Sequence, residues 1–490
     1  MGQKRQKLQL ALMLFISAIT QFIVMGKAAA VAGAFGVDTD IDAYNAVHSI
    51  ANFLFSFISS GITTVLIPAY IQNKKQKSID SFLTLLYLSG IIAVGISYVL
   101  QVPILRCFSS GQTGFVEIGC SVFLITMLSQ FFNTSMGVST AYFQVKDKYN
   151  IPKVCTLLAN AALLILIVAD SELTIYRYAL YTAITTVANA IVQLLISLKY
   201  KYRFSFAVSF KDPEVKEMIK IFLPTVFSAG LYQVNLLTDS FISSRLGEGQ
   251  ISILTYSNQV VTLVNALLIT NIITFLYPKI VATFEKEMSY QQERLFGYIY
   301  FAEATMALLL VGFCSIGKEA VELLYEHGKF DSANTTLVFQ CICLYMIGLP
   351  INMARDLIYR FFYGKGNTKE TFKNSVTVSI LNFVISIILA QFIGLYGVIL
   401  GTVISSLFSM CMIFARMVKN YGFHYEKKKL IAEHLKIIVV MVASIAIVLL
   451  IKSLVNINII ATILIFGCMS VIVFFALLLL VKSQSLKVKF

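Results

Sequence analysis

The strongest constraint on this chain is a series of long apolar stretches that recurs along its whole length. About fourteen can be counted, each near or above the roughly 20 residues that a helix needs to cross the hydrocarbon core of a bilayer. Only 13% of the residues are charged, against about 25% in an average soluble domain, so a water-soluble fold would leave much apolar surface exposed. The pattern predicts an all-α, polytopic membrane protein.

The predicted spans form two halves and a terminal pair. They cover residues 8–35, 42–71, 80–105, 114–144, 151–169, 174–199, 218–244, 249–278, 294–324, 333–362, 372–393, 396–418, 434–454 and 457–481. A polar stretch at about 200–217 separates the sixth span from the seventh, and Pro68 and Pro278 stand near the ends of the second and eighth spans in similar contexts. Because six is an even number, the two halves run parallel. We therefore predict an N-terminal lobe, a C-terminal lobe and two added helices, at residues 1–200, 201–420 and 421–490.

Basic residues recur after every second predicted span. The net charge is +14, and the clusters that supply much of it are Lys74, Lys75 and Lys77; Lys146 and Lys148; Lys199, Lys201 and Arg203; Lys365 and Lys369; and Lys427, Lys428 and Lys429. Cytoplasmic loops of membrane proteins carry such an excess of Lys and Arg. We therefore predict a multi-pass protein of the bacterial plasma membrane with both termini in the cytoplasm. The charge orients the chain in its bilayer, and no nucleic-acid partner is expected.

Four groups of residues occur in order along the first twelve predicted spans. They are Gly26-Lys-Ala-Ala-Ala-Val-Ala-Gly-Ala-Phe35-Gly36 with Asp42-Ala-Tyr44, Asn52 and Gly61; Leu324-Tyr-Glu-His-Gly-Lys-Phe-Asp331; Arg360-Phe-Phe-Tyr-Gly-Lys-Gly-Asn-Thr368; and Gly394-Leu-Tyr-Gly397 through Thr402. In this combination the chain resembles a divergent member of the MurJ/MviN-type lipid II flippases. These belong to the multidrug/oligosaccharidyl-lipid/polysaccharide exporter superfamily.

The resemblance implies a transporter and not an enzyme. The implied activity is to flip an undecaprenyl-diphosphate-linked glycan, either lipid II or a related cell-envelope polysaccharide precursor, from the inner to the outer leaflet by alternating access. The implied fold has two lobes in a V, with a central cationic cavity between spans one, two, seven and eight. Spans thirteen and fourteen would form a groove for the polyprenyl tail.

The chain departs from the family's arginine-rich cavity. At matching positions it has Ala18, Phe55 and Gln259, and Thr262 stands where an acidic residue is common. Lys27 alone keeps a positive charge there. Lipid II and other diphosphate-linked glycans, for capsule, exopolysaccharide or teichoic acid, therefore both remain open as the cargo.

Polar groups inside the spans are the candidates for substrate binding, because such groups are costly in hydrocarbon. The candidate cavity residues are Lys27, Asp42, His48, Asn52, Asn235, Asn258 and Gln259. Lys27 can meet a diphosphate as a point charge, or it snorkels to the outer interface. Asp42 either pairs with Lys27 or caps the second helix. His48 and Asn52, which share one helix face, can bond sugar hydroxyls or make an interhelical contact.

Ionisable residues also occur in the ninth and tenth predicted spans. Arg355, Asp356 and Arg360 are candidates for an inner gate or an intramembrane ion pair, with anchoring at the helix end as the alternative. Glu303 is a lone carboxylate that either carries a proton or cation or stays neutral and hydrogen-bonded.

A last group of oxygen-bearing side chains raises one cofactor. Asp239, Asn382, Ser386 and Thr402 match positions that resemble a monovalent-cation site in some relatives, although Ser386 replaces a carboxylate there. Oxygen ligands suit a hard cation. The sequence therefore raises Na⁺ as a bound ion and no other cofactor.

Two other function classes stay open. One is a cation-coupled exporter of drugs or other small molecules in the same superfamily, although such exporters usually have twelve spans. The other is a membrane enzyme that polymerises or ligates glycans, which would need a large extracytoplasmic loop. No predicted outward loop exceeds about fifteen residues, and the eight cysteines show no zinc or redox spacing. The expected partners are a lipid-linked oligosaccharide, the bilayer and enzymes of glycan assembly.

Overall fold

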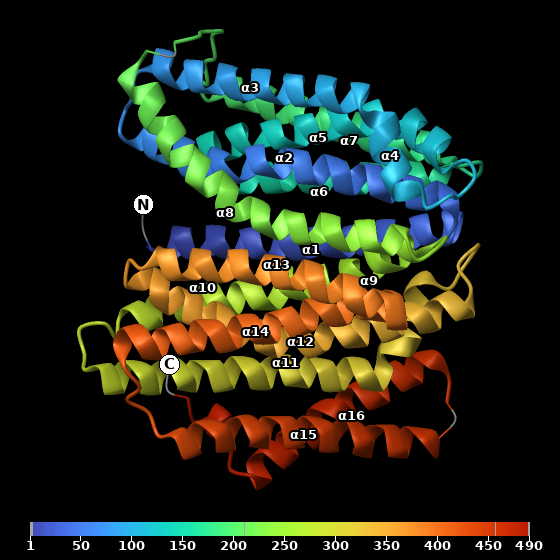
Figure 1. Cartoon of the computed structure of the whole chain (residues 1–490), viewed down its shortest axis with the longest axis vertical. Coiled ribbons are helices and arrows are strands. Elements are labelled where there is room, and N and C mark those ends of the chain that lie inside the picture. Colours follow the sequence, from blue (N-terminus) through green and yellow to red (C-terminus); the bar gives the residue numbers. More distant parts are fainter. Residues whose placement is uncertain (1–2, 210, 456, 489–490) are drawn as a thin grey trace. The chain divides into compact units, whose positions relative to one another are not determined.

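The computed structural model describes residues 3–209, 211–455 and 457–488, with their side chains except at 3–11, 57, 60, 224, 225, 227–229, 231 and 232. This part of the chain contains helices and turns and no strand (Figure 1). The α-helices are α1 (Gln3–Phe35), α2 (Thr39–Ile71), α3 (Gln76–Val99), α4 (Gln101–Ser109), α5 (Phe115–Val145), α6 (Asn150–Ala169), α7 (Ile175–Lys199), α8 (Pro213–Ser244), α9 (Gln250–Val264), α10 (Thr270–Val281), α11 (Met288–Tyr325), α12 (Ser332–Gly364), α13 (Thr368–Ile393), α14 (Leu395–Tyr421), α15 (Lys427–Ser453) and α16 (Ile459–Leu480). A π-helical turn, η1 (Asn265–Ile269), joins α9 to α10, and a 3₁₀ turn, η2 (Gln484–Lys487), follows α16.

The lengths and apolarity of these helices confirm the predicted polytopic all-α class. Thirteen spans in the described residues are long and apolar enough to cross a membrane. Helix α8 corresponds to the remaining predicted span, 218–244. Its 32 residues reach about 48 Å, which is also sufficient.

Two of the predicted spans contain a local irregularity whose position was not predicted. The span 80–105 divides into α3 and α4 at Leu100. Pro103 explains the break, because it has no N–H to donate to the carbonyl of Val99 and its ring would clash with that carbonyl. The span 249–278 contains η1 between α9 and α10, and π-turns of this kind occur often at functional sites.

The chain divides into two compact units, residues 1–252 and 253–490. The first unit contains α8, whereas the predicted lobes were divided at residue 200. Helix α8 lies in the second half of the predicted repeat, but it packs against α2 of the first half. This packing moves the observed boundary from residue 200 to residue 252. The three predicted parts, including a lipid-tail groove at 421–490, stay a prediction.

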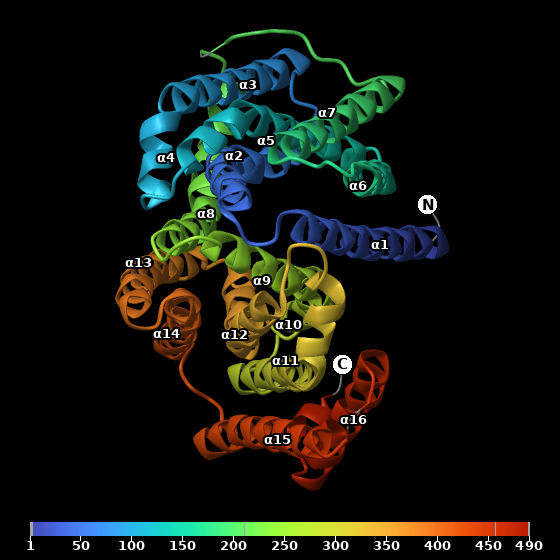
Figure 2. The same ribbon diagram turned by 90° about the vertical axis from the view of Figure 1, so that its right-hand side faces the viewer.

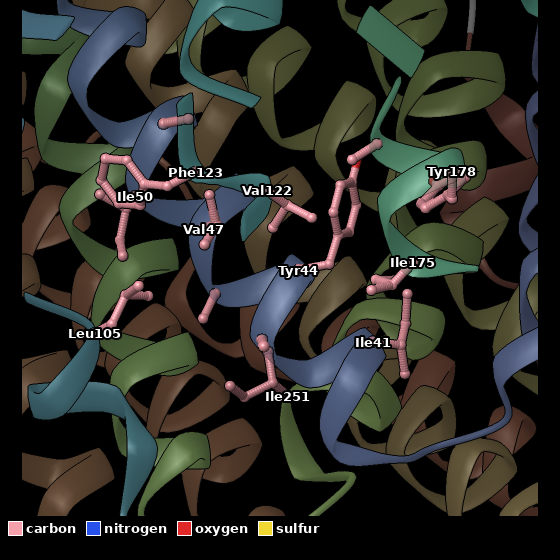
Figure 3. Close-up of a cluster of buried hydrophobic side chains, with 14 of the residues drawn as sticks. Ile41, Tyr44, Val47, Ile50, Leu105, Val122, Phe123, Ile175, Tyr178 and Ile251 are labelled. Carbon is pink, nitrogen blue, oxygen red and sulfur yellow. The ribbon is translucent and has the colours of Figure 1, made fainter. Parts of the chain in front are cut away.

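Helix α2 lies at the centre of the first unit, because its two faces pack against α5 and α8. Figure 3 shows the apolar side of this arrangement, where Val47 of α2 meets Val122 of α5, with Tyr178 of α7 nearby. On the other side, Gly61 lets α8 approach, since a Cβ there would overlap the ring of Phe222. The absence of a side chain at Gly61 thus leaves room for the ring of Phe222.

The polar stretch after α7 is held along α3. Asp80 accepts hydrogen bonds from the backbone N–H and the hydroxyl of Ser205, at 3.2 and 2.8 Å. Further along, the Ser78 hydroxyl donates to Asp212 at 2.7 Å, and Asp212 also caps α8. Residues 200–209, together with Asp212, are therefore docked on α3 within the first unit, and we call them the docked strap.

In the second unit, α13 and α14 pack closely through glycines. A Cβ at Gly397 would overlap the backbone of α13 at Leu389, and one at Gly401 would overlap Ser386. Small residues four apart allow such contact between membrane helices. This packing explains one of the four sequence groups that carried the family resemblance.

The last two long helices, α15 and α16, pack against α11, as both ribbon views show (Figures 1 and 2). Near one end of α15, His434 lies 2.7 Å from Glu303 of α11. Near the other end, Lys452 forms an ion pair with Glu319 of α11, also at 2.7 Å. Polar contacts thus attach α15 to α11 at two levels, and Glu303 is paired with a histidine instead of standing alone.

Candidate functional site

A buried carboxylate, Asp42, lies near the end of α2 that is predicted to face outward. It accepts hydrogen bonds from the N–H of Gly249 at 2.7 Å and from the N–H and hydroxyl of Ser252 at 2.8 and 2.5 Å. The side chain is fully buried, so these bonds replace the water that a carboxylate otherwise needs. Asp42 therefore caps the beginning of α9 from the neighbouring helix α2.

The turn before α9 caps α2 in return. Glu248 accepts hydrogen bonds from the N–H and the hydroxyl of Thr39, at 3.0 and 2.6 Å. Side-chain acceptors at helix starts satisfy N–H groups that have no partner within the helix. We call these reciprocal contacts, among Thr39, Asp42, Glu248, Gly249 and Ser252, the outer latch.

The outer latch assigns Asp42 a different role from the two expected ones. Asp38 is the residue that caps α2, since it accepts from the N–H of Ile41 at 3.2 Å. No ion pair joins Asp42 to Lys27 in the described residues. The expectation that Asp42 caps α2 or pairs with Lys27 was therefore wrong, because the start of α9 engages both oxygens of the carboxylate.

The middle of α2 carries a chain of polar side chains that reaches α5. The Asn52 amide lies 3.1 Å from His48 Nδ1, and the Gln130 amide of α5 lies 3.1 Å from His48 Nε2. Asn133 then donates to Gln130 Oε1 at 3.1 Å. We call His48, Asn52, Gln130 and Asn133 the amide ladder. Its first three members are half-buried and Asn133 is exposed.

Lys27 of α1 is the cation of this region. It is half-buried and close enough to His48 to interact with it electrostatically. The first unit therefore brings together three of its predicted cavity residues, Lys27, His48 and Asn52. It places Asp42 apart from them, in the outer latch.

Helix α8 contributes Asn235 and Asp239, of which the first is half-buried and the second buried. The interface between α2 and α8 includes a polar contact, since the hydroxyls of Ser49 on α2 and Ser240 on α8 lie 3.1 Å apart. The contact between α2 and α8 is thus a mixture of apolar packing and hydroxyl pairs.

In the second unit, Asn258 and Gln259 are half-buried neighbours on α9. The π-turn begins six residues after Gln259, and the Thr270 hydroxyl donates to the carbonyl of Asn265 at 3.0 Å across it. A local change in helix winding beside two amides supports the prediction that this span is functional.

The three charged residues of α12 do not act as one cluster. Arg355 and Asp356 form an ion pair at 2.8 Å, as one of the predicted alternatives required. Arg360 lies over the rings of Tyr277 and Tyr363, 5.8 and 5.7 Å from their centroids. A gating role for these residues stays a prediction.

The predicted cation ligands are divided between the two units. In the second unit, Asn382 donates to the Thr402 hydroxyl at 2.9 Å, and Ser386 donates to the carbonyl of Val398 at 3.3 Å. Asp239 belongs to the first unit. The described residues contain no group of three or more His, Cys, Asp or Glu side chains that could hold a metal ion. A Na⁺ site of amide, hydroxyl and one carboxylate oxygen stays a prediction.

Sequence reasoning missed Gln130, Asn133 and Ser252. The first two were visible as a polar pair, three residues apart, within an otherwise apolar span. Ser252 carried no signal, because it meets Asp42 across 210 positions of sequence.

A polytopic all-α protein whose spans carry amides, an imidazole and a cation, as this one does, has features typical of membrane transporters. A solved structure described as "Lipid II flippase MurJ, inward closed conformation" matches with a TM-score of 0.82 and 21% identity, covering 95% of this chain and 98% of the other. A multidrug resistance MATE family transporter of the MOP superfamily matches with a TM-score of 0.63 and 14% identity, covering 83% of this chain and 97% of that one. At these identities both show the fold alone.

The family follows from sequence. The model of the family described as Lipid II flippase MurJ matches residues 31–469. A probable lipid II flippase MurJ of Rickettsia prowazekii is 21% identical over 430 residues, covering 84% of each chain, and one of Helicobacter pylori is 31% identical over 212 residues, covering 43% of this chain and 45% of the other. The chain belongs to the lipid II flippase MurJ family, which confirms the predicted resemblance.

Proposed function

We propose that this chain carries an undecaprenyl-diphosphate-linked glycan across the bacterial plasma membrane, from the inner to the outer leaflet, and that lipid II is the first candidate cargo. The single observation that carries the proposal is the match of the MurJ family model to residues 31–469. The likeness to multidrug transporters is coarser, so the exporter alternative is not favoured.

The polar groups of the first unit suit this task. A sugar diphosphate headgroup must cross about 30 Å of hydrocarbon, and a path with hydrogen-bonding groups lowers that cost. Lys27 supplies a positive charge for the diphosphate, and the half-buried His48 and Asn52 supply neutral hydrogen-bonding groups near it. No covalent chemistry is required of any residue.

The outer latch supports an alternating-access cycle. It joins the predicted outward ends of α2 and α9 through a fully buried carboxylate. A closed outer end is the condition for loading from the cytoplasmic side, so the bonds of Asp42 must break before cargo can leave outward. Their rupture is the proposed opening step.

The chain's departures from the family pattern bear on the choice of glycan. Phe55, at a position where the family carries arginine, is 2% exposed and packs edge-to-face against Phe131 with centroids 6.2 Å apart. The missing charge is thus replaced by core packing. Because Lys27 is then the main cation of the proposed path, neutral groups contribute more to recognition, and a related diphosphate-linked polysaccharide precursor is the second candidate cargo.

The energy source and the surroundings are further parts of the proposal. The membrane potential supplies about 2.3 kcal/mol per charge per 100 mV, sufficient to bias a cycle that moves Lys27 or a bound cation. Na⁺ is the proposed ion, and its candidate ligands in the second unit are the oxygens of Asn382, Ser386 and Thr402. The basic loops support the proposal that both termini lie in the cytoplasm, where enzymes of glycan assembly are the proposed partners.

Depletion of the protein in its own host tests the proposal. Lipid II exposed at the outer leaflet is measured before and after depletion, and after rescue with the wild-type chain or with Lys27→Gln. A sharp fall that only the wild type reverses supports lipid II as the cargo. Unchanged lipid II at the outer leaflet removes that cargo, and the same measurement is then made on capsule, exopolysaccharide and teichoic acid precursors.

A further inference from the structure

The amide ladder lies at mid-depth in the first unit. Gln130 is the middle residue of α5, about 22 Å from either end of that helix. Asn133 is exposed one turn further toward the predicted cytoplasmic end. An exposed amide at the centre of a span is costly against lipid, so this position indicates a polar path beside α5.

The ladder offers hydrogen-bond donors and acceptors together. A neutral imidazole has one N–H and one lone pair. Both ring nitrogens of His48 face amide nitrogens at 3.1 Å, so the lone pair of the ring accepts from one of them. Gln130 in turn accepts from Asn133 through its oxygen at 3.1 Å, so the ladder presents both donors and acceptors along one wall.

We propose that this ladder recognises the neutral hydroxyl and N-acyl groups of the sugar in the transported headgroup, with Gln130 and Asn133 as residues that determine specificity. The inference rests on the proposed function and adds the part of the cargo that is recognised. Sugar hydroxyls both donate and accept, which suits a wall of alternating polarity. The diphosphate is recognised separately, by the charge of Lys27.

A second polar ladder in the same unit provides a contrast. Gln193 of α7 accepts from the Ser139 hydroxyl of α5 at 2.9 Å and donates to Asn189 at 3.0 Å. Gln193 is 1% exposed and Asn189 is 7% exposed, so these amides are enclosed. Ser139 lies about 13 Å along α5 from Gln130. An enclosed ladder holds helices together, whereas one that ends at an exposed amide can also meet a ligand.

Binding to two purified lipids distinguishes the sugar from the diphosphate. The full chain is placed in nanodiscs, and its affinity is measured for lipid II and for undecaprenyl diphosphate, which lacks the sugar. We expect Gln130→Leu and Asn133→Ala each to weaken lipid II binding about five- to tenfold, since each removes a hydrogen bond of ordinary strength. Binding of undecaprenyl diphosphate should change less than about twofold. Gln193→Leu is the matched control and should alter neither affinity. If Gln130→Leu does not fold, Asn133→Ala still tests the inference.

The remaining outcomes separate the two proposals. If the variants weaken both lipids equally, or neither, the ladder does not recognise the sugar and the inference is wrong, while the proposed function stands. If the wild-type chain binds neither these lipids nor another diphosphate-linked glycan, the proposed function fails and the inference fails with it.

Discussion

The carboxylate of Asp42 and the backbone N–H of Ser252 lie 2.8 Å apart, although 210 positions separate the two residues in sequence. This contact makes the beginning of α9 depend on a side chain of α2. A helix start that is capped by its own N-terminal residue would be independent of its neighbour. Here the two helix ends are joined within the first unit, and their separation is the opening step that the proposed cycle requires.

Neutralising Asp42 should loosen the outer latch. Asp42→Asn removes the charge and turns an NH₂ donor toward the N–H groups of Gly249 or Ser252. Hydrogen bonds to a charged group contribute about 1.5–3 kcal/mol each, so loss of one such bond should raise the open population tenfold or more. A cysteine at Ile251, which is 1% exposed, reports opening through its reaction with a membrane-impermeant maleimide in a chain whose eight native cysteines are replaced.

The control for that experiment is the exposed half of the latch. Glu248→Gln alters the bonds to Thr39, which water can replace, and should change labelling less than about threefold. Equal labelling rates in the Asp42→Asn and wild-type chains would contradict a gating role for the buried carboxylate.

Gly249 is required by the geometry of the latch. Its φ is +79°, and a Cβ there would lie 2.7 Å from the carbonyl oxygen of Val37. Gly249→Ala should therefore cost about 1–3 kcal/mol in the closed state, lower the thermal unfolding temperature and speed labelling at Ile251→Cys. Gly95→Ala is the matched control, since that helical glycine has nothing within 4 Å of the added atom, and it should leave stability equal or slightly higher. An unchanged unfolding temperature for Gly249→Ala would show that the turn can adopt another conformation.

Local patterns predicted the helices of this fold well. Apolar length gave nearly every span, and the π-turn and the break at Leu100 were missed because hydrophobicity does not change there. Pro103 was visible as a cause of the break at Leu100. One proline within an apolar run, however, does not show where its helix will divide.

The site was less predictable because its contacts are not local. His48 and Asn52 were paired correctly from their spacing on one helix, yet their connection to Gln130 depends on how α2 packs with α5. Asp42 was expected to cap the helix on which it stands. Its partners lie over 200 positions away, and no periodicity in one sequence reports such a contact.

The mobility of the docked strap should depend on pH. The hydrogen bond from Ser78, followed by that from the N–H of Glu214, lowers the pKa of Asp212 below its ordinary value. A carboxyl with a lowered pKa stabilises the folded state above its unfolded pKa of about 4, and this contribution is lost as the pH falls through the lower folded value. A spin label at Phe206, which is 73% exposed, should therefore be restrained at pH 7 and become more mobile below about pH 4.

The variant Asp212→Asn checks the cause of that transition. It should lessen the dependence of label mobility on pH and leave the strap more mobile at pH 7. A strap equally restrained from pH 7 to pH 3 in the wild-type chain would show that the bonds of Ser205 to Asp80 hold it without Asp212.

Lys27 should act on the diphosphate and not on the sugar. Lys27→Gln removes the positive charge, so it should weaken lipid II and undecaprenyl diphosphate by the same factor, about tenfold, whereas Lys27→Arg should keep most of the affinity for both. Arg177, an exposed cation near the predicted outward end of α7 that pairs with Asp170 at 3.1 Å, provides the control, and Arg177→Gln should leave both affinities unchanged. If Lys27→Gln binds both lipids as the wild type does, the ammonium only snorkels toward the interface, and another residue must meet the diphosphate. If it weakens lipid II alone, the division of the headgroup between Lys27 and the amide ladder is wrong.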